Sequence, residues 1–490
     1  MPLSQNQEPI RLPLDPSPSL YNDDLAPNSP EARHWGSYSL FALWTNDVHN
    51  VANYSFAIGL FALGMSGGQI VAAMGLGALL IYGLMNLSGY IGQRTGLPFP
   101  VICRIAFGIR GAQFPALIRA VIAVAWFGIQ TYLASLVLGV LLLTLAPGLA
   151  AWSGGDVLGL SPFGWACFIG VWLLQLAIMA YGMEMIRRYE AFAGPVILLT
   201  LAVLAAWMYW KAGLRIAWAS SEPASGAAGW FRVCSGAALW ISLYGTMLLN
   251  FSDFSRHCPD ARTIRRGNFW GLPVNMLLFG CIAAVLAGSQ FAIDGQVITS
   301  PTDIVAAIPS KPFLVLGCLA LLIVTVAVNI MANFVAPALV LCNLAPRQLN
   351  FHRAGLLAAA LGALILPWHL YNSPEVILYF LGALGALLGP LYGVIMVDYW
   401  LVRRGRLDIP ALYSAAPDAA YHYRHGVNPR ALAALLPAAI IAIALVLLPS
   451  LEALSSFSWF IGAGLAAVFY LLVGNRRYRF DVWKEAFKRH

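Results

Sequence analysis

A tryptophan and a glutamine lie one helical turn apart in the stretch AWFGIQT, at residues 125–131. Because side chains four residues apart share one face of an α-helix, Trp126 and Gln130 place a flat aromatic ring beside an amide with two donors and an acceptor. That pairing suits a planar ring carrying N–H and C=O groups. A simpler explanation stands beside it, because tryptophans are common in membrane helices and a lone glutamine often only bonds a neighbouring helix.

Three apolar segments carry polar side chains in their middle. Polar groups at the depth of a bilayer are costly and mark functional sites, and interrupted helices are tolerated only where they line a cavity within the protein. The polar groups are Asn46, Asp47, His49, Asn50 and Asn53 in the first segment, Ser242, Tyr244, Thr246 and Asn250 in the sixth, and Asn329 and Asn333 before Pro337 in the eighth. The alternative is a plain helix bundle in which these groups only hold helices together.

The composition predicts an all-α membrane protein. The chain has 490 residues, of which 60% are hydrophobic and only 10% are charged, whereas soluble domains carry roughly 25% charged residues. Crossing about 30 Å of hydrocarbon takes roughly 17 to 25 apolar residues, and twelve such spans are expected. They lie at 39–63, 68–93, 115–145, 162–183, 189–210, 228–252, 271–293, 312–340, 354–368, 374–400, 432–448 and 456–473.

The distribution of charge predicts the orientation and excludes several function classes. Arginines gather in alternate loops, which predicts a bacterial inner-membrane protein with both termini cytoplasmic. The expected outer loops hold Lys211, Arg215, Arg232 and Lys311. The net charge of +8 is therefore explained by topology, and no nucleic-acid partner is expected because the basic residues are dispersed. The seven cysteines form no CxxC pair, so neither a disulfide framework nor a metal site is indicated.

The spacing of the polar segments predicts two repeats of five helices. The first and sixth spans are five apart, as are the third and eighth, and inverted repeats with broken helices at the midplane are a common transporter plan. We expect a disordered cytoplasmic tail at 1–38, repeats at 39–210 and 228–400, a cytoplasmic loop at 401–431, two C-terminal helices at 432–473 and a basic tail at 474–490. Nothing in the sequence requires an oligomer or a cofactor, and membrane lipid is the expected surrounding.

The chain resembles the first nucleobase:cation symporter family, which contains the bacterial hydantoin, allantoin, uracil and cytosine permeases. The resemblance covers about residues 25–406 and rests on LPFPVICRIAFGIRGAQFPALIRAVIAVAWFGIQT, LLNFSDFSRH, NIMANFVAP and GPLYGVIMVDYWLVRR. It implies twelve transmembrane helices, a five-plus-five inverted repeat with discontinuous first and sixth helices, two further C-terminal helices and alternating access.

The resemblance also implies a substrate held between two aromatic rings, one on the third helix and one on the sixth. Trp126 and Gln130 match the family's third-helix pair. On the sixth helix this chain departs from the family, because Tyr244 stands where the spacing places a tryptophan. Trp240, one turn earlier, is the alternative.

Two further substrate contacts are implied by the same comparison. Asn333 matches the eighth-helix asparagine that bonds the substrate. Asn50 falls where the family's first-helix glutamine lies, and His49 takes that place if the register shifts by one residue.

The coupling ion is the second departure from the family. Sodium-coupled members have two adjacent hydroxyl side chains directly before the first asparagine of the eighth-helix motif, and here Ala327 and Val328 occupy those positions. Sodium is a hard cation that prefers several oxygen ligands, which neither side chain offers. Backbone oxygens at Asn46, His49 and Val324 remain and would hold at most a weak ion.

Proton coupling is the expected substitute. Asp47 and His49 lie together at the proposed break of the first helix, where a buried carboxyl group and an imidazole can exchange protons as access alternates. The alternative is that Asp47 caps the broken helix and His49 bonds a backbone carbonyl.

The remaining charged residues are expected to be structural. An inner-gate salt bridge is expected among Asp253, Arg104, Arg110, Asp398 and Arg403, at helix ends. Glu184 and Glu190, beside Arg187 and Arg188, are expected on a solvated loop face.

The sequence therefore predicts a secondary transporter that imports a small planar nucleobase or related amide ring, with uracil-like pyrimidines favoured and proton symport expected. A hydantoin or allantoin permease, sodium-coupled or facilitative, is the nearest alternative, and a transporter-like nutrient receptor is another. An enzyme is not expected, because no HExxH motif and no clustered Cys/His motif is present.

Overall fold

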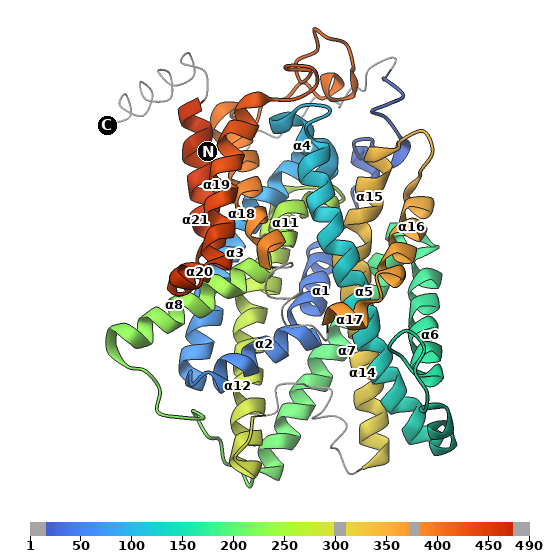
Figure 1. The fold of residues 1–490 in the computed structure, drawn as a ribbon, viewed down its shortest axis with the longest axis vertical. Coiled ribbons are helices and arrows are strands. Elements are labelled where there is room, and N and C mark those ends of the chain that lie inside the picture. The colour runs from blue at the N-terminus through green and yellow to red at the C-terminus, as the bar shows by residue number, and fades with distance from the viewer. Residues whose placement is uncertain (1–15, 298–309, 372–381, 474–490) are drawn as a thin grey trace.

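The computed structural model describes residues 16–297, 310–371 and 382–473, which form helices running alongside one another (Figure 1). The α-helices are α1 (Ser37–Val48), α2 (Val51–Ala62), α3 (Gly67–Thr95), α4 (Phe99–Phe107), α5 (Gln113–Leu145), α6 (Pro162–Met179), α7 (Gly182–Lys211), α8 (Gly226–Leu243), α9 (Gly245–Asn250), α10 (Ser252–Ser255), α11 (Ala261–Phe269), α12 (Asn275–Asp294), α14 (Lys311–Val328), α15 (Val335–Leu344), α16 (Phe351–Leu364), α17 (Pro367–Tyr371), α18 (Gly382–Val397), α19 (Pro429–Leu447), α20 (Glu452–Ser455) and α21 (Ser458–Val473).

Three π-helical turns lie between or after these helices. They are η4 (Trp270–Val274) between α11 and α12, η5 (Asn329–Phe334) between α14 and α15, and η7 (Asp398–Val402) after α18. A π turn holds an extra residue and frequently occurs at a functional site.

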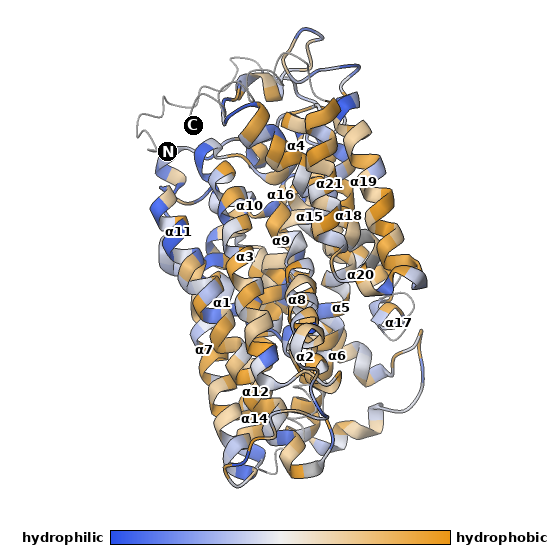
Figure 2. Ribbon diagram, turned by 90° about the vertical axis from the view of Figure 1, so that its left-hand side faces the viewer, coloured by the Kyte–Doolittle hydropathy of each residue, from blue (hydrophilic) through white to orange (hydrophobic). Residues whose placement is uncertain are grey.

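The lengths and hydropathy of the helices confirm an all-α membrane protein. Among the described residues, eight helices are long and apolar enough to cross a membrane, or nine if the bent pair Pro449–Ser455 and Ser458–Val473 forms one span. Figure 2 shows that apolar residues cover most of the long helices, while α11 is largely hydrophilic. The twelve expected spans are consistent with these helices, although residues 374–381 and the basic tail 474–490 lie outside the described residues.

Local sequence signals fix where individual helices begin and end. Before α3, Ser66 accepts the backbone N–H of Gln69, whose side chain accepts the N–H of Ser66 in return, which forms a capping box. The helix ends at Gly96, whose φ of +70° is a left-handed conformation that glycine adopts without strain.

The first and sixth spans are broken, as the sequence predicts. The first is divided at His49 and Asn50, between α1 and α2, and the sixth is divided at Tyr244, between α8 and α9. The inverted relation between the two five-helix halves stays a prediction.

The expectation of a disordered N-terminal tail is wrong for residues 16–36. This stretch forms two short 3-10 turns, and its polar side chains bond backbone carbonyls far along the chain. The Asn22 amide donates to the Leu349 carbonyl, in the loop between α15 and α16, at 2.6 Å. The Arg33 guanidinium donates at 2.7 Å to the Gln93 carbonyl in the last turn of α3, where the helix leaves carbonyl groups without partners. The earlier part of the tail lies outside the described residues.

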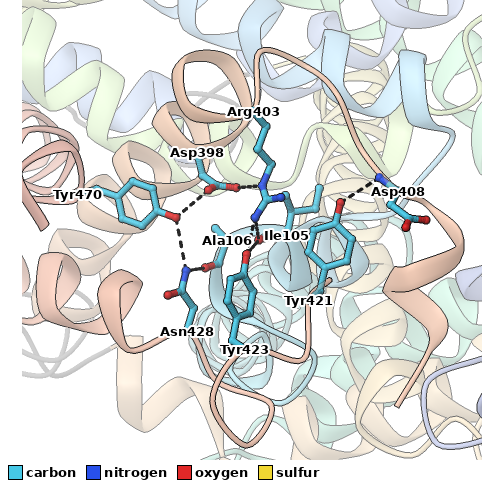
Figure 3. A network of polar contacts seen from close by, with 9 residues as sticks. All are labelled: Ile105, Ala106, Asp398, Arg403, Asp408, Tyr421, Tyr423, Asn428 and Tyr470. Atoms are coloured by element: carbon cyan, nitrogen blue, oxygen red, sulfur yellow. Dashed lines mark hydrogen bonds and ion pairs between the residues drawn. The ribbon is translucent and has the colours of Figure 1, made fainter. Parts of the chain in front are cut away.

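The end of the bundle at which α4 and segment 403–428 lie is called the basic face (Figure 1, top). There the Ile105 carbonyl, near the end of α4, accepts the Tyr423 hydroxyl at 2.7 Å and the Arg403 guanidinium at 3.1 Å (Figure 3). Arg403 also forms the expected ion pair with Asp398, at 2.7 Å. Burial raises the pKa of the Tyr423 phenol, so this hydroxyl stays a hydrogen-bond donor at physiological pH.

The next two carbonyls of α4 are capped by a single asparagine. The Asn428 amide donates to the Ala106 carbonyl at 2.7 Å, and the Asn428 backbone N–H donates to the Phe107 carbonyl at 2.8 Å. The last turn of α4 is therefore completed by groups that come more than 290 residues later in the chain.

Candidate functional site

Helix α5 presents the tryptophan and the glutamine singled out by the sequence. The helix passes close to α16 because Gly128 has no side chain, and a Cβ atom there would lie 2.3 Å from the Gly362 carbonyl oxygen. Trp126 is half-buried and Gln130 is 5% exposed. The Gln130 amide forms no hydrogen bond with any of the described residues. Because buried amides in proteins are normally bonded, this one is available to a ligand.

The break in the first span is held together by its own asparagines. Asn50 caps α2 by accepting the backbone N–H of Asn53 at 2.9 Å, and its amide donates to the Asp47 carbonyl at 2.6 Å. The Asn53 amide donates to the same carbonyl at 2.7 Å. The side chain of Asn50, expected to contact substrate, is thus engaged with the backbone in this conformation.

His49 is also engaged within the protein. The Tyr54 hydroxyl lies 2.8 Å from Nδ1, and the Asn275 Oδ1 atom lies 3.0 Å from Nε2. A neutral imidazole with its proton on Nε2 satisfies both bonds, by accepting from Tyr54 and donating to Asn275. The ring is completely buried. His49 therefore stabilises the break between α1 and α2. This role is close to the alternative in which His49 bonds the protein rather than carrying a proton.

Tyr244 brings the sixth-span break against the first. Its hydroxyl accepts from the Asn53 amide at 3.4 Å, and the same amide donates to the Asp47 carbonyl at 2.7 Å. Tyr244 and Asp47 are buried at the junction of the two breaks. The structure thus places together two residues that the sequence assigned separately to substrate and ion.

Trp240 lies in the core directly beside Tyr244, with the two ring centroids 5.3 Å apart. Its indole stacks on Phe56 at a centroid distance of 5.7 Å and on Phe279 at 5.2 Å, and its N–H donates to the Met276 sulfur. The side chain is completely buried. Of the two sixth-helix aromatics, Tyr244 is therefore the better candidate for a substrate contact.

Variants of the two aromatics are expected to separate folding from binding. Trp240→Ala removes a stacked core side chain and should destabilise the protein by about 3 to 5 kcal/mol. Tyr244→Trp should keep the fold and shift preference among ring sizes, because an indole narrows the space beside the ring. Thermal unfolding in detergent and ligand competition measure the two effects. A Trp240→Ala protein of normal stability that had lost binding would reverse this assignment.

The π turn η5 carries the third part of the candidate site. The Asn329 amide donates to the Thr131 hydroxyl at 3.0 Å and to the Gln175 side-chain oxygen at 2.6 Å. Its own oxygen accepts the Asn333 amide at 3.1 Å. Asn329 thus ties η5 to α5 beside Gln130, and the Asn333 side-chain oxygen has no donor among the described residues.

The positions expected to hold an ion lack side-chain oxygens on the eighth span. Val324, Ala327 and Val328 are buried in α14. On the first span, the Asn46 amide turns towards Glu190 of α7 and donates to its carboxylate at 2.6 Å. The Oδ1 atom of Asn46 and the Oε1 atom of Glu190 are both buried without a partner among the described residues.

The expectation of a solvated Glu190 is wrong, because this side chain is only 2% exposed. Glu184 does lie on the surface, bonded to Arg187 at 2.6 Å and Arg188 at 2.9 Å. The two glutamates differ because α7 turns the later one towards α1. The position of Glu190 inside the apolar segment 189–210 was the available signal.

A second residue missed from the sequence is Arg119, which is completely buried within the span 115–145. Asp253, which was expected in an inner-gate salt bridge, instead accepts the backbone N–H of Phe99 at 2.7 Å and the Asn250 amide at 2.9 Å. Arg104 likewise bonds neutral oxygens rather than a carboxylate. Arg110 is exposed, and no ion pair to it is found among the described residues.

Two other kinds of site find little support in the described part of the chain. No group of three or more histidine, cysteine or acidic residues there could hold a metal ion. A groove of about 370 Å³ between α5, α15 and α16 is lined by apolar side chains, which does not suit a ring with amide edges.

Comparison with known proteins identifies the family. Residues 27–462 match the family of permeases for cytosine/purines, uracil, thiamine and allantoin. An allantoin permease of Bacillus subtilis is 35% identical over 93% of this chain and 93% of its own length. A purine-uracil permease of Arabidopsis thaliana is 36% identical over 90% of this chain and 74% of its own length.

A solved structure has the same fold. It is a transporter of the nucleobase-cation-symport-1 family in a closed conformation with bromovinylhydantoin bound, and it superposes with a TM-score of 0.75 at 23% identity. The superposition covers 92% of this chain and 95% of that one. The chain is therefore a member of the nucleobase:cation symporter-1 family, whose members are membrane permeases and not enzymes.

Proposed function

We propose that this permease imports a small planar ring with amide or imide edges, with uracil-like pyrimidines as the preferred class, by proton symport. Family membership supports the general function, which is that of a permease that moves nucleobases or related rings together with a cation. The ring preference and the coupling ion are inferred from the residues of the candidate site.

The observation that carries this proposal is that the Gln130 side chain and the Asn333 side-chain oxygen have no hydrogen-bond partner among the described residues. Gln130 retains two donors and an acceptor, and Asn333 retains its side-chain oxygen. Uracil presents alternating N–H and C=O groups along its edge, which such amides can match. Trp126 and Tyr244 supply aromatic faces for the ring, and an aromatic substrate gains most from stacking on them.

Allantoin is the second candidate, because the Bacillus relative is named for it and matches nearly the whole chain. Uptake of labelled uracil into proteoliposomes, with unlabelled allantoin, hydantoin and cytosine as competitors, decides between the classes. Half-inhibition by allantoin at a concentration about tenfold below that of uracil would overturn the pyrimidine preference. Binding without uptake would instead favour a receptor.

Trp126→Ala is expected to weaken uracil binding about tenfold or more. Stacking of a base on an aromatic side chain contributes roughly 1 to 3 kcal/mol. Trp126→Phe should retain most of the affinity, because a smaller ring still stacks. Trp230→Ala, which removes an exposed tryptophan of α8, serves as the matched control. Half-saturation of uptake measures the change, and an unaltered value in a correctly inserted Trp126→Ala protein contradicts the assignment.

The basic face is proposed to be cytoplasmic, in a bacterial inner membrane. Arg94, Arg104, Arg256 and Arg403 contact helix ends or aromatic rings at or near that face, and arginine-rich loops are retained on the cytoplasmic side during insertion.

A further inference from the structure

Arg119 is a buried charge in the second turn of α5 that the proposed substrate contacts do not use. It lies two turns before Trp126, on the same helix face, and its side chain is 0% exposed. The Nε atom donates to the Asn250 side-chain oxygen at 3.0 Å, and Nη2 donates to the Ala332 carbonyl at 2.7 Å. An ionised side chain at this depth is costly and is retained where it serves the transport pathway.

The bond to Ala332 stabilises the irregular turn that carries Asn333. Pro337 has no N–H to offer the preceding turn, and the π turn η5 further disturbs the regular backbone bonding. Backbone that is irregular inside a membrane needs donors from neighbouring helices. The Arg119 guanidinium is such a donor, directly beside a candidate substrate residue.

The bond to Asn250 continues to the basic face. The Asn250 amide donates to Asp253 at 2.9 Å, and the other oxygen of Asp253 accepts the Phe99 N–H at the start of α4. Arg119, Asn250 and Asp253 are all buried, so solvent does not reach these residues between the candidate site and α4 in this conformation. A continuous chain of hydrogen bonds therefore links η5 to α4.

This chain joins two groups of helices that have different main packing partners. Helix α5 packs against α14, α15 and α16, whereas α9 packs against α3 and α18. Alternating access in transporters of this plan moves one such group against the other. The bond between Arg119 and Asn250 crosses between the groups and must break in that movement.

The unpaired Nη1 atom of Arg119 indicates that this side chain has a second hydrogen-bonding arrangement in another conformation of the protein. Nη1 is buried without an acceptor among the described residues, whereas Asp253 and Asp47 are the carboxyl groups whose charges act on Arg119. A buried N–H donor without a partner is unfavourable. This cost is explained if the Nη1 donor is bonded in another state of the transport cycle.

We propose that Arg119 is a positioning residue that couples the ring site to the opening of the basic face. It holds η5 in both states and releases Asn250 when the basic face opens. The inference rests on the proposed transport function, because it assigns a step of the same cycle.

Accessibility of Cys103 tests the release. This cysteine is completely buried in α4, and a variant that retains it alone, reconstituted in proteoliposomes, can be labelled with an impermeant maleimide from the side of the basic face. Without substrate, Arg119→Gln and Asn250→Ala should each speed labelling about tenfold, and the double variant should be no faster than either single one. Arg119→Lys should be intermediate. Arg232→Gln, an exposed arginine, is the matched control and should leave labelling unchanged.

Uracil binding to the same proteins separates coupling from substrate contact. The affinity of Asn250→Ala, which leaves the bond from Arg119 to η5 in place, should stay within about threefold of the parent, while its maximal rate of uptake falls. Additive labelling rates, or weakened binding with unchanged labelling, would overturn the proposal. If Arg119→Gln fails to insert, Asn250→Ala breaks the same bond and decides alone. Absence of uracil binding in the parent would refute the uracil assignment, yet the labelling rates would still report on the bond.

Discussion

Gln130→Leu is expected to abolish uracil uptake while leaving the protein folded. The Gln130 amide bonds no described residue, so its loss costs the fold little, whereas a ring amide entering the site would lose its partner. An unpaired buried polar group costs about 1 to 3 kcal/mol, and a site built for hydrogen bonding discriminates by still larger factors. Affinity should fall at least about 100-fold, measured by equilibrium binding in detergent.

Asn333→Leu should reduce affinity similarly but also lower thermal stability, because it removes the bond to Asn329. Gln130→Asn, which keeps a shortened amide, should recover part of the binding lost in Gln130→Leu. Normal affinity in both leucine variants would show that the ring lies elsewhere.

The second large effect expected is the dependence of accumulation on a proton gradient. The side chains of Ala327 and Val328 provide no oxygen for sodium, whereas Asp47 of α1 and Glu190 of α7 are buried carboxyl groups. An imposed sodium gradient should drive little accumulation into proteoliposomes. An inward proton gradient should drive it, and uptake should decrease as the external pH rises, because fewer carriers are loaded with a proton outside.

Three variants locate the proton carrier. Asp47→Asn and Glu190→Gln, tested separately, should leave exchange of substrate for substrate partly intact, and at least one should abolish proton-driven accumulation. His49→Gln is expected to disturb the first-helix break instead, because both ring nitrogens are bonded there. Sodium-driven uptake, with sodium raising substrate affinity, would show that backbone oxygens suffice for the ion.

The sequence predicted the features that depend on spacing along one helix. The apolar spans follow from composition, and the breaks in the first and sixth spans follow from polar residues that lipid cannot accommodate. Trp126 and Gln130 were found because their separation places them on one face of α5.

The sequence did not predict correctly the roles of residues that depend on which face of a helix packs against a neighbouring helix. Averaging over a whole span hides a single charge such as Arg119. Glu190 was assigned to a loop because it lies at the start of the expected span 189–210, whereas α7 begins already at Gly182. The roles of His49 and Trp240 are decided by partners far along the chain, Asn275 and Phe56 among them. Such partners have no signature in local sequence.

The closure of α4 by segment 403–428 has a consequence for how the chain can be divided. Three successive carbonyls of α4 depend on groups that precede α19 and α21, and Tyr470 of α21 donates to Asp398 at 2.7 Å. The last two helices are therefore not a detachable addition to a ten-helix transporter. A chain shortened to its first ten spans would leave the last turn of α4 uncapped, so evolution or engineering could remove the last two helices only by first supplying substitute donors.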